Sequence, residues 1–492
     1  MLSYSALLAR LADERPGEVA VTQLARAAAA YTVTWESLWR AADAGAGWLV
    51  ESGIRPGELV LNLLGNTWEA IAGNFAIWRA GGCPLPLDPQ AAPEALQRIV
   101  GLTGATVALA SAPVLGLRVG TAEVLSPGRG RSTRLPEDLT PPRRKAIATS
   151  GTTRSPRVVV HQGPAEFGEA PTAVLDTVYG SLGLRNGQRQ LVVAALSHNM
   201  GFDLAHVGLL AGHRLVLAPA MRGEDLFELV HGHRIEYVGV PPFFMQQAVD
   251  LLPERAGELA SLEAVKHSGS ACPVPVKTAW LSALGPERVF EAYGMTEGHG
   301  RTVISGREWL EHPGSVGRPW KSEVSVVGES GPLPPGELGR IAFRDLSGGR
   351  SVVLGEDIPA VGSEVWHGSG QGWHETDDLG RTDDRGYLYL NGRATETVNV
   401  FGLQVSLLEV ESVLRKHPEV ADCLVGLGPS GQLAALVVPT VPKTVRLAAR
   451  LRSYCRTGLH PHEVPVSFRE VVAIPRNAAW KPDRKLAAAL LD

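Results

Sequence analysis

The hydrophobic pattern of the first hundred residues alternates between a helical and a strand period. Apolar residues recur every three or four positions from Trp35 to Leu49, and again from Trp68 to Ala80. Between them, Leu59–Leu64 is a short apolar run that predicts a buried strand. Pro84–Leu87 is expected to be extended and not a central strand, because proline cannot donate to a ladder. This alternation predicts βα units and a largely parallel sheet.

Short apolar strands continue through the middle of the chain, and several end in small or polar residues. The predicted strands are Leu191–Leu196, Arg214–Leu217, Ile235–Val240, Leu262–Lys266 and Val289–Ala292. In open α/β sheets, ligands bind beyond the carboxyl ends of the strands. We therefore expect a ligand site where these strands end.

The character of the chain changes twice towards its C-terminus. Beyond Gly314 the pattern is β structure punctuated by Gly and Pro, and after Arg393 it becomes a mixture of helices and strands. We predict an α/β protein with a large N-terminal domain, residues 1–392, built from βα sheets plus a β-rich subdomain. A small, mobile α+β domain, residues 393–492, is expected to follow, at the low end of normal domain size.

A loop rich in hydroxyl groups stands out between two apolar runs. Ala146–Ala148 and Val158–Val160 predict the strands of a hairpin, and Thr149–Arg157 forms its tip. The loop's glycine, hydroxyls and guanidinium groups suit a phosphate. The preceding Ser126–Lys145 is rich in Pro, Gly and basic residues, and is expected to be a mobile solvated loop.

Composition and charge exclude several classes of protein. The 492 residues are 44% hydrophobic and 20% charged, with a formal net charge of -4, which argues against a nucleic-acid binder. No apolar stretch is long enough for a membrane span, and the amphipathic start does not resemble a signal peptide. The four cysteines are too scattered for a metal site or a disulfide framework. We expect a cytoplasmic protein without membrane partners.

Five motifs, taken in order, resemble the adenylate-forming superfamily, which includes acyl-CoA synthetases, aryl-acid and peptide-synthetase adenylation enzymes and luciferase. The matching stretches are Thr149–Arg157, Tyr293–Glu297, Thr376–Asp378, Gly392–Glu411 and Pro475–Arg484. They cover essentially the whole chain. The resemblance is greatest to bile-acid-type CoA ligases and to marinacarboline-type amide bond synthetases.

The resemblance implies that the chain uses ATP and Mg²⁺ to convert a carboxylic acid into its acyl-AMP, with release of pyrophosphate. Lys481 and Thr296 would be catalytic, and Glu297 would bind the metal. The residues that would hold the nucleotide are Thr149, Ser150, Gly151, Thr152, Thr153, Arg157, Ser270, Tyr293, Gly294, Asp378 and Arg393.

The apolar residues Phe202, Phe243, Phe244 and Met295 suggest an aromatic or heteroaromatic acid. The residues predicted to bind it are His198, Phe202, Asp203, Gly269, Gly294 and Met295.

Asp203 and His206 would be neighbours on one face of a helix, where an Asp-oriented His could deprotonate an amine. A helix pair without chemistry is the alternative.

Departures from the family pattern bear on the acceptor of the acyl group. Arg154 and Arg157 replace glycine and lysine of the usual phosphate loop, Trp480 replaces a glycine, and Glu463 stands where many CoA ligases have lysine. We favour an amine acceptor, which would give an amide. Coenzyme A, another nitrogen nucleophile such as nitrite, and a non-catalytic nucleotide sensor are the alternatives. The acid and the oligomeric state stay open.

Overall fold

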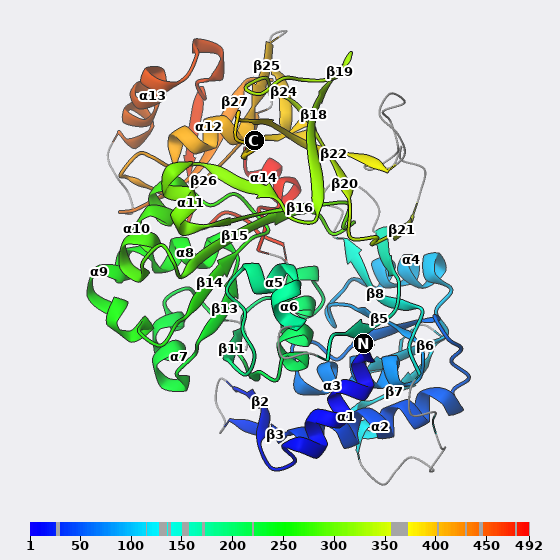
Figure 1. The fold of residues 1–492 in the computed structure, drawn as a ribbon. Coiled ribbons are helices and arrows are strands. Elements are labelled where there is room, and N and C mark those ends of the chain that lie inside the picture. Colours follow the sequence, from blue (N-terminus) through cyan, green and yellow to red (C-terminus); the bar gives the residue numbers. More distant parts are fainter. Residues whose placement is uncertain are drawn as a thin grey trace.

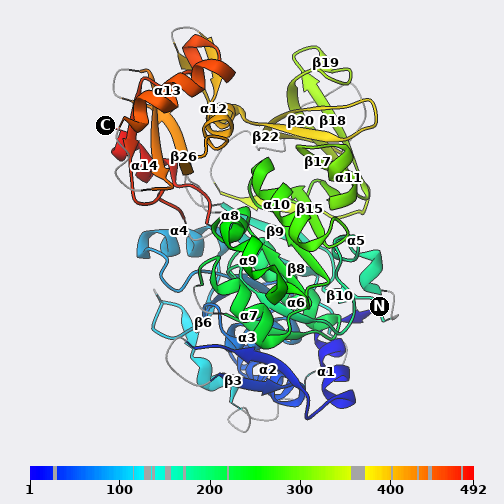
Figure 2. The same cartoon turned by 90° about the vertical axis from the view of Figure 1, so that its left-hand side faces the viewer.

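The computed structural model describes residues 1–491 except for 26–29, 115, 127–134, 136–138, 150–156, 170–172, 219–220, 356–371, 401–402, 429–430, 442–445 and 478–479. Figure 1 shows the N-terminal helices at the base, a broad sheet through the middle and the C-terminal elements at the top. In Figure 2 the C-terminal elements and the β-rich subdomain stand side by side above the large α/β body.

A sheet of 14 strands runs through the α/β body and the β-rich subdomain, in the order β19-β18-β20-β22-β23-β17-β16-β15-β14-β13-β11-β12-β2-β3. Its parallel strands are β2 (Val19–Gln23), β12 (Arg214–Leu217), β11 (Arg189–Val192), β13 (Tyr237–Val240), β14 (Ala264–His267) and β15 (Val289–Gly294). The strands that pair antiparallel are β3 (Tyr31–Thr34), β16 (Arg301–Ser305), β17 (Ser315–Pro319), β18 (Ser322–Gly328), β19 (Gly331–Pro332), β20 (Gly339–Asp345), β22 (Trp373–Thr382) and β23 (Leu388–Arg393).

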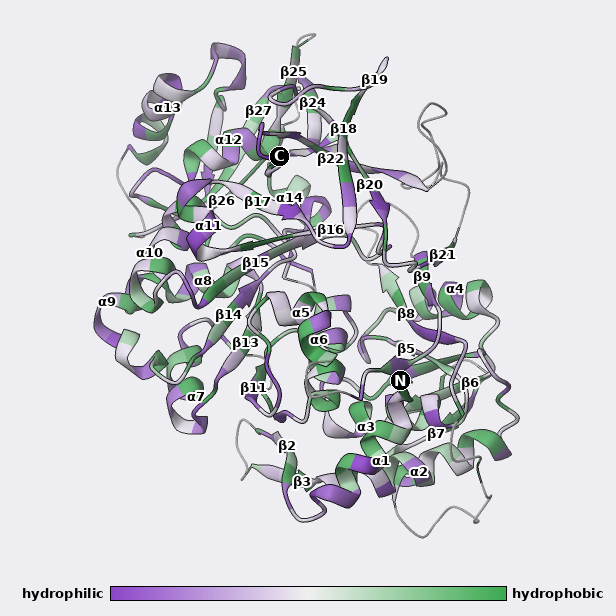
Figure 3. Cartoon of the chain, viewed as in Figure 1, coloured by the Kyte–Doolittle hydropathy of each residue, from purple (hydrophilic) through white to green (hydrophobic). Residues whose placement is uncertain are grey.

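Alternate residues of the parallel strands enter two separate cores. Leu215, Leu217, Tyr237 and Ala264 face α6, whereas Leu191, Val216, Val238 and Val265 face the helices on the other side. The helix on the first face is α6 (Asn199–Leu210), which is mostly hydrophobic in Figure 3. Those on the second face are α7 (Asp225–His233), α8 (Pro242–Ala248) and α10 (Val274–Leu284). The period of two in a strand therefore decides which side chains meet α6.

A second, parallel sheet lies in the N-terminal region, in the order β5-β4-β6-β7. Its strands and the nearby helices are β5 (Cys83–Pro86), β4 (Leu59–Leu63), β6 (Val107–Ala110), β7 (Arg118–Gly120), α1 (Tyr4–Glu14), α2 (Trp35–Glu51), α3 (Trp68–Arg79) and α4 (Pro93–Thr103). The helices and the strand predicted for residues 35–80 are confirmed. The proline-rich strand β5 lies at the edge of this sheet. This position suits it, because its prolines lack the N–H groups that a second neighbouring strand would need.

The predicted hairpin is present, and its first strand begins earlier than expected. A small sheet holds β8 (Arg143–Thr149), β9 (Arg157–Gln162) and β21 (Ser351–Leu354), and a two-stranded ribbon joins β1 (Leu2–Ser3) to β10 (Glu166–Phe167). Residues 143–145 were assigned to a mobile loop, and this was wrong, because Lys145 and Ala146 are buried strand residues that pair with β9. The short helices of the body are α5 (Val178–Ser181), α9 (Leu252–Arg255) and α11 (Gly306–Glu311).

The C-terminal part has two small sheets and hydrophobic clusters of its own. It contains β24 (Thr397–Val400), β25 (Leu403–Ser406), α12 (Leu407–Leu414), β26 (Val420–Leu427), β27 (Leu433–Pro439), α13 (Leu447–Gly458), β28 (Ser467–Glu470) and α14 (Arg484–Leu491). The predicted α/β class with a smaller C-terminal domain is confirmed. The boundary at residue 393 stays a prediction. None of the helices in the described ranges is long and apolar enough to cross a membrane.

Candidate active site

Three strands of the large sheet bring Tyr293, Asp378 and Arg393 together. The Tyr293 hydroxyl donates to Oδ2 of Asp378 at 2.5 Å, and Nε of Arg393 donates to Oδ1 at 3.0 Å. Thr376 Oγ1 accepts the backbone N–H of Asp378 at 3.0 Å. Burial and the Asp378 charge both raise the pKa of Tyr293, so its phenol remains a donor at neutral pH. The cluster therefore holds an oriented carboxylate beside an aromatic ring, which suits the hydroxyls of a ribose.

A second contact joins the hairpin to the loop after β15. Thr149 and Arg157 face each other at the end of the β8–β9 ladder, and a guanidinium nitrogen of Arg157 lies 4.0 Å from Oε1 of Glu297. Glu297 is 8% exposed, so its carboxylate is a buried charge at this junction. The predicted phosphate-loop residues Ser150, Gly151, Thr152 and Thr153 lie outside the described residues.

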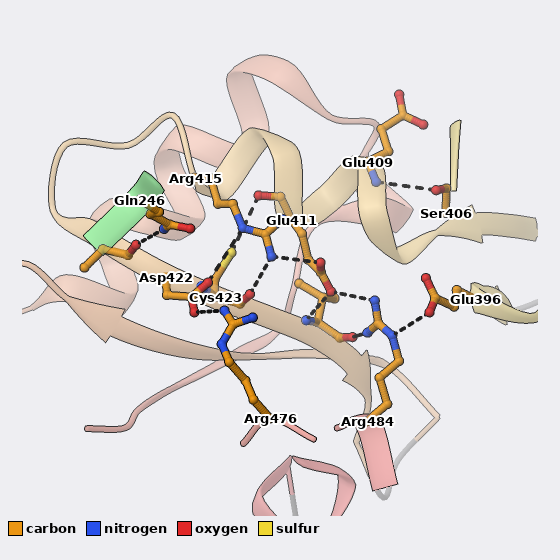
Figure 4. Close-up of polar contacts among 12 residues, drawn as sticks. Gln246, Glu396, Ser406, Glu409, Glu411, Arg415, Asp422, Cys423, Arg476 and Arg484 are labelled. Carbon is orange, nitrogen blue, oxygen red and sulfur yellow. Dashed lines mark hydrogen bonds and ion pairs between the residues drawn. The ribbon is translucent and has the colours of Figure 1, made fainter. Parts of the chain in front are cut away.

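The segment that carries Lys481 is anchored on both sides. Arg476 bonds to Asp422 at 2.6 Å, and Arg484 bonds to the buried Glu411 at 3.0 Å, as Figure 4 shows. Both acidic partners come from the C-terminal part of the chain. The two arginines therefore fix the terminal segment on the core of that part.

Lys481 is exposed, yet it lies close to charged residues of the large sheet. The surrounding protein lowers its pKa by desolvation, Arg393 lowers it further, and Asp378 and Glu297 act in the opposite direction. Its position links the C-terminal part to both clusters described above.

Trp480 joins the two parts of the chain next to Lys481. Its ring stacks on Phe243 of α8, with centroids 5.3 Å apart and planes 17° from parallel, and it meets Phe244 edge-on. The Arg476 guanidinium lies 4.1 Å from the Phe243 ring centroid. Trp480 has φ +60°, where a non-glycine residue is strained, so the ring contacts must stabilise this conformation. Phe243 and Phe244 therefore take part in the contact with Trp480, and the aromatic acid that they suggest stays a prediction.

The predicted pair of Asp203 and His206 is not formed. Asp203 accepts hydrogen bonds from Lys145 Nζ and, at 2.9 Å, from the Tyr179 hydroxyl. His206 Nδ1 donates to the backbone oxygen of Phe202 at 2.6 Å instead. Burial lowers the pKa of His206 to about 4, and its ring packs among aromatic core residues. The prediction of an Asp-oriented catalytic histidine was wrong, because Asp203 bonds to Lys145 of β8. The spacing of residues along a helix gives no information about a partner on a distant strand.

Phe202 was also assigned to the pocket, and this was wrong. It is 2% exposed and packs against Trp78 and His206 in the core. Met295 packs against the β-rich subdomain, and His198 is the N-cap residue of α6.

The remaining predicted residues lie on loops that follow two parallel strands. Gly269 and Ser270 follow β14 and are exposed, and Gly269 has φ +95° with open space where a Cβ would stand. Gly294 ends β15, and the half-buried Thr296 lies two residues further, directly before Glu297. These positions agree with the expectation that ligands meet the carboxyl ends of the strands. Their roles stay predictions.

Sequence reasoning missed two buried lysines near α6. Lys145 lies on β8 and Lys266 on β14, and each is 3–4% exposed. Buried lysines are rare, so a lysine within an apolar strand pattern deserves notice. The sequence of Ala264–His267 contains such a lysine and could have identified Lys266 as a candidate.

No group of three or more His, Cys, Asp or Glu side chains able to hold a metal occurs in the described part of the chain. Magnesium bound to a nucleotide needs only one or two carboxylates, since phosphates and waters supply the other ligands. Glu297 therefore fits as a single protein ligand.

Known proteins resemble the chain over nearly its whole length. Residues 8–350 match the AMP-binding enzymes, and residues 409–481 match the AMP-binding enzyme C-terminal domain. Phosphinothricin tripeptide synthetase PhsC of Streptomyces viridochromogenes is 29% identical over 92% of this chain, and a 2-succinylbenzoate–CoA ligase of Geobacillus kaustophilus is 27% identical over 92%. The chain spans 42% of the length of the former and 91% of the latter.

The solved structure of amide bond synthetase McbA from Marinactinospora thermotolerans shares the fold, with a TM-score of 0.76 over 99% of both chains and 24% identity. The family match covers well over half of the chain and takes in the motifs at Thr149 and Tyr293, and the matched C-terminal domain ends on Lys481. The chain belongs to the AMP-binding enzymes of the adenylate-forming superfamily.

Proposed function

We propose that the protein activates an aromatic carboxylic acid with ATP and transfers the acyl group to an amine. The observation that carries the activation step is the position of Lys481, which lies within the electrostatic field of Asp378, Arg393 and Glu297. These residues come from motifs that are far apart in the sequence. Groups suited to a ribose, a metal-bound phosphate and a carboxylate thus lie close enough to one another to interact electrostatically.

In the activation step, an oxygen of the acid attacks the α-phosphorus of ATP, the bond to the β-phosphate breaks and pyrophosphate leaves. Negative charge builds up on phosphoryl oxygens, so positioned cations lower the barrier. Lys481 would hold the attacking carboxylate against the α-phosphate, and Thr296 would donate to that phosphate. Asp378 and Arg393 would orient the ribose hydroxyls, and Arg157 would attract the leaving phosphates.

Mg²⁺ would neutralise phosphate charge when bound, and Glu297 is its proposed protein ligand. Arg157, 4.0 Å away, keeps this buried carboxylate paired when no cation is present.

The state of Asp203 favours an acid without an α-ammonium group. A free amino acid would need an unpaired carboxylate in this region, but Asp203 already has Lys145 and Tyr179 as partners. Lys145 and, more weakly, Arg144 lower the pKa of Asp203 to about 2 against the effect of burial. An aryl acid, which brings no such cation, is therefore the better substrate.

Two features favour an amine as the acceptor. Glu463 puts a carboxylate where a lysine would help to hold the phosphates of CoA, and its Oε2 accepts the backbone N–H of His460 at 2.8 Å. The Trp480 stack also holds the segment that carries Lys481 against α8.

Transfer to coenzyme A is the second candidate. This candidate is favoured by the similarity to the 2-succinylbenzoate–CoA ligase of Geobacillus kaustophilus, which aligns with 92% of this chain. The activation step is the same for both acceptors.

The two candidates are separated by incubating the protein with ATP, Mg²⁺ and a panel of aryl acids, together with either a primary amine or CoA. We expect acid-dependent exchange of pyrophosphate into ATP, and amide detected by mass spectrometry. Thioester without amide would overturn the amine acceptor. If folded protein exchanged no pyrophosphate with any acid, the activation step itself would be wrong.

A further inference from the structure

Lys266 is a buried cation beside the carboxyl end of a parallel strand. It is the third residue of β14 (Ala264–His267), two positions after Ala264, so the strand period directs it to the face that α6 covers. Its neighbour on β13 is Gly239, where an added Cβ would lie 2.2 Å from Leu204 of α6. The helix therefore packs closely here, and Lys266 is 4% exposed beneath it.

Lys266 has a neutral partner in place of a carboxylate. Among the described residues, its Nζ donates one hydrogen bond, to Oγ of Ser268. Ser268 in turn donates to the sulfur of Met200 at 3.2 Å, and a thioether is only a weak acceptor. Burial lowers the pKa of Lys266 to about 8. A buried ammonium normally requires a charged partner, so this one is incompletely stabilised.

The nearby carboxylates already have bonded partners. Asp203 is bonded to Lys145 and Tyr179 on the α6 face, and Glu291 is bonded to Lys277 on the opposite face of the sheet. Both carboxylates raise the pKa of Lys266 from a distance, but each is bonded to another lysine. Positive charges therefore outnumber carboxylates around Asp203, where Arg144 and Arg301 also repel Lys145.

The loop that follows Lys266 reaches the solvent. Ser268 is half-buried, and the exposed Gly269 has no atom within 4 Å of the position of a Cβ. Met200, which touches Ser268, is half-buried at the start of α6. The buried ammonium group is thus bonded to a half-buried hydroxyl that a ligand at this loop could approach.

We infer that the acid carries a second anionic group, and that Lys266 and Ser268 select for this group. Lys266 would be a specificity residue, because it binds a part of the substrate that does not react. The inference rests on the proposed activation of an aryl acid. It narrows the substrate class to aromatic acids with a second carboxylate or a comparable anion.

The test compares benzoate with the three benzenedicarboxylates in pyrophosphate exchange, for the full-length wild type, Lys266→Met and Ser268→Ala. We expect the wild type to prefer at least one dicarboxylate. In Lys266→Met, the ratio of kcat/KM for that dicarboxylate to kcat/KM for benzoate should fall by about tenfold to a hundredfold, as for the loss of a hydrogen bond to a charged group. The smaller change Ser268→Ala should lower the ratio in the same direction. Lys416→Met, which removes an exposed lysine of the C-terminal part, should leave the ratio unchanged.

Binding without ATP gives a readout that does not depend on catalysis. The same acids should raise the thermal midpoint of the wild type more than that of Lys266→Met, and only when they carry the second carboxylate. The inference is wrong if the wild type prefers benzoate to every dicarboxylate, or if Lys266→Met weakens all acids equally. In either case exchange with benzoate would leave the proposed function standing, whereas dicarboxylate binding without any exchange would overturn that function alone.

Discussion

At the scale of single residues, Lys481 makes the most direct prediction. Arg393 repels its ammonium group and Asp378 and Glu297 attract it, and the residue is exposed, so it is available to a ligand carboxylate. Lys481→Ala should lower pyrophosphate exchange by about a hundredfold to a thousandfold, the usual cost of losing a group that stabilises transition-state charge. Transfer from added acyl-AMP should continue. Lys485→Ala, on the exposed side of α14, is the matched control, and normal exchange in Lys481→Ala would refute the assignment.

His206 makes a prediction about pH. Its Nε2 accepts from Asn74 at 3.2 Å, and the Asn74 amide is oriented by Asn62, whose own oxygen accepts the backbone N–H of Leu64. A proton on Nε2 would therefore face an N–H group. This arrangement is consistent with the pKa of His206, which burial lowers from 6.5 to about 4.

Because the folded state favours neutral His206, the unfolded chain takes up the proton first as the pH falls. The stabilisation is complete above about pH 6.5 and is lost between 6.5 and 4. From pH 7 to pH 5 the free energy of unfolding should fall by about 2 kcal/mol on account of this residue. His206→Phe should remove that part of the pH dependence in denaturant titrations, and exposed His231→Asn should retain it. An unchanged slope in His206→Phe would contradict the prediction.

At the scale of elements, the ion pair of Lys145 and Asp203 ties β8 to α6. Removing one partner leaves a buried charge, so Lys145→Met should lower the free energy of unfolding by about 3–5 kcal/mol. The double variant Lys145→Met/Asp203→Leu should recover most of that loss, because no unpaired charge remains. Chemical denaturation measures this coupling. Additive losses in the double variant would show that the pair does not join the two elements.

The surroundings of helix α6 show which features of the structure could be predicted from the sequence. The strands around it follow from local periods, which depend on residues close together in the chain. The family resemblance further implied that Tyr293, Asp378 and Arg393 hold one nucleotide, and the structure brings these three side chains together. The partner of Asp203 could not be predicted, because Lys145 lies 58 residues away and competes with His206 only once β8 packs beside the helix. The Trp480 contact was missed for the same reason.

At the scale of the whole molecule, the stack of Trp480 on Phe243 connects the C-terminal part to the body. An aromatic pair contributes about 0.5–1.5 kcal/mol beyond its buried area, so Trp480→Ala should reduce the docked population and the exchange rate by about threefold to tenfold. Phe243→Ala should have the same effect, and the double variant should lose little more. Trp320→Ala, in the β-rich subdomain, should leave the rate unchanged. Fully additive losses in pyrophosphate exchange would mean that the two rings act separately.

The continuous sheet determines how this molecule would respond to a pulling force. Fourteen strands join the α/β body and the β-rich subdomain, whereas β26, β27 and β28 form a sheet apart from it in the described structure. Tension between the C-terminal part and the body would therefore load the aromatic stack at Trp480 and not the hydrogen bonds of the large sheet. That load would act next to the lysine on which the proposed chemistry depends.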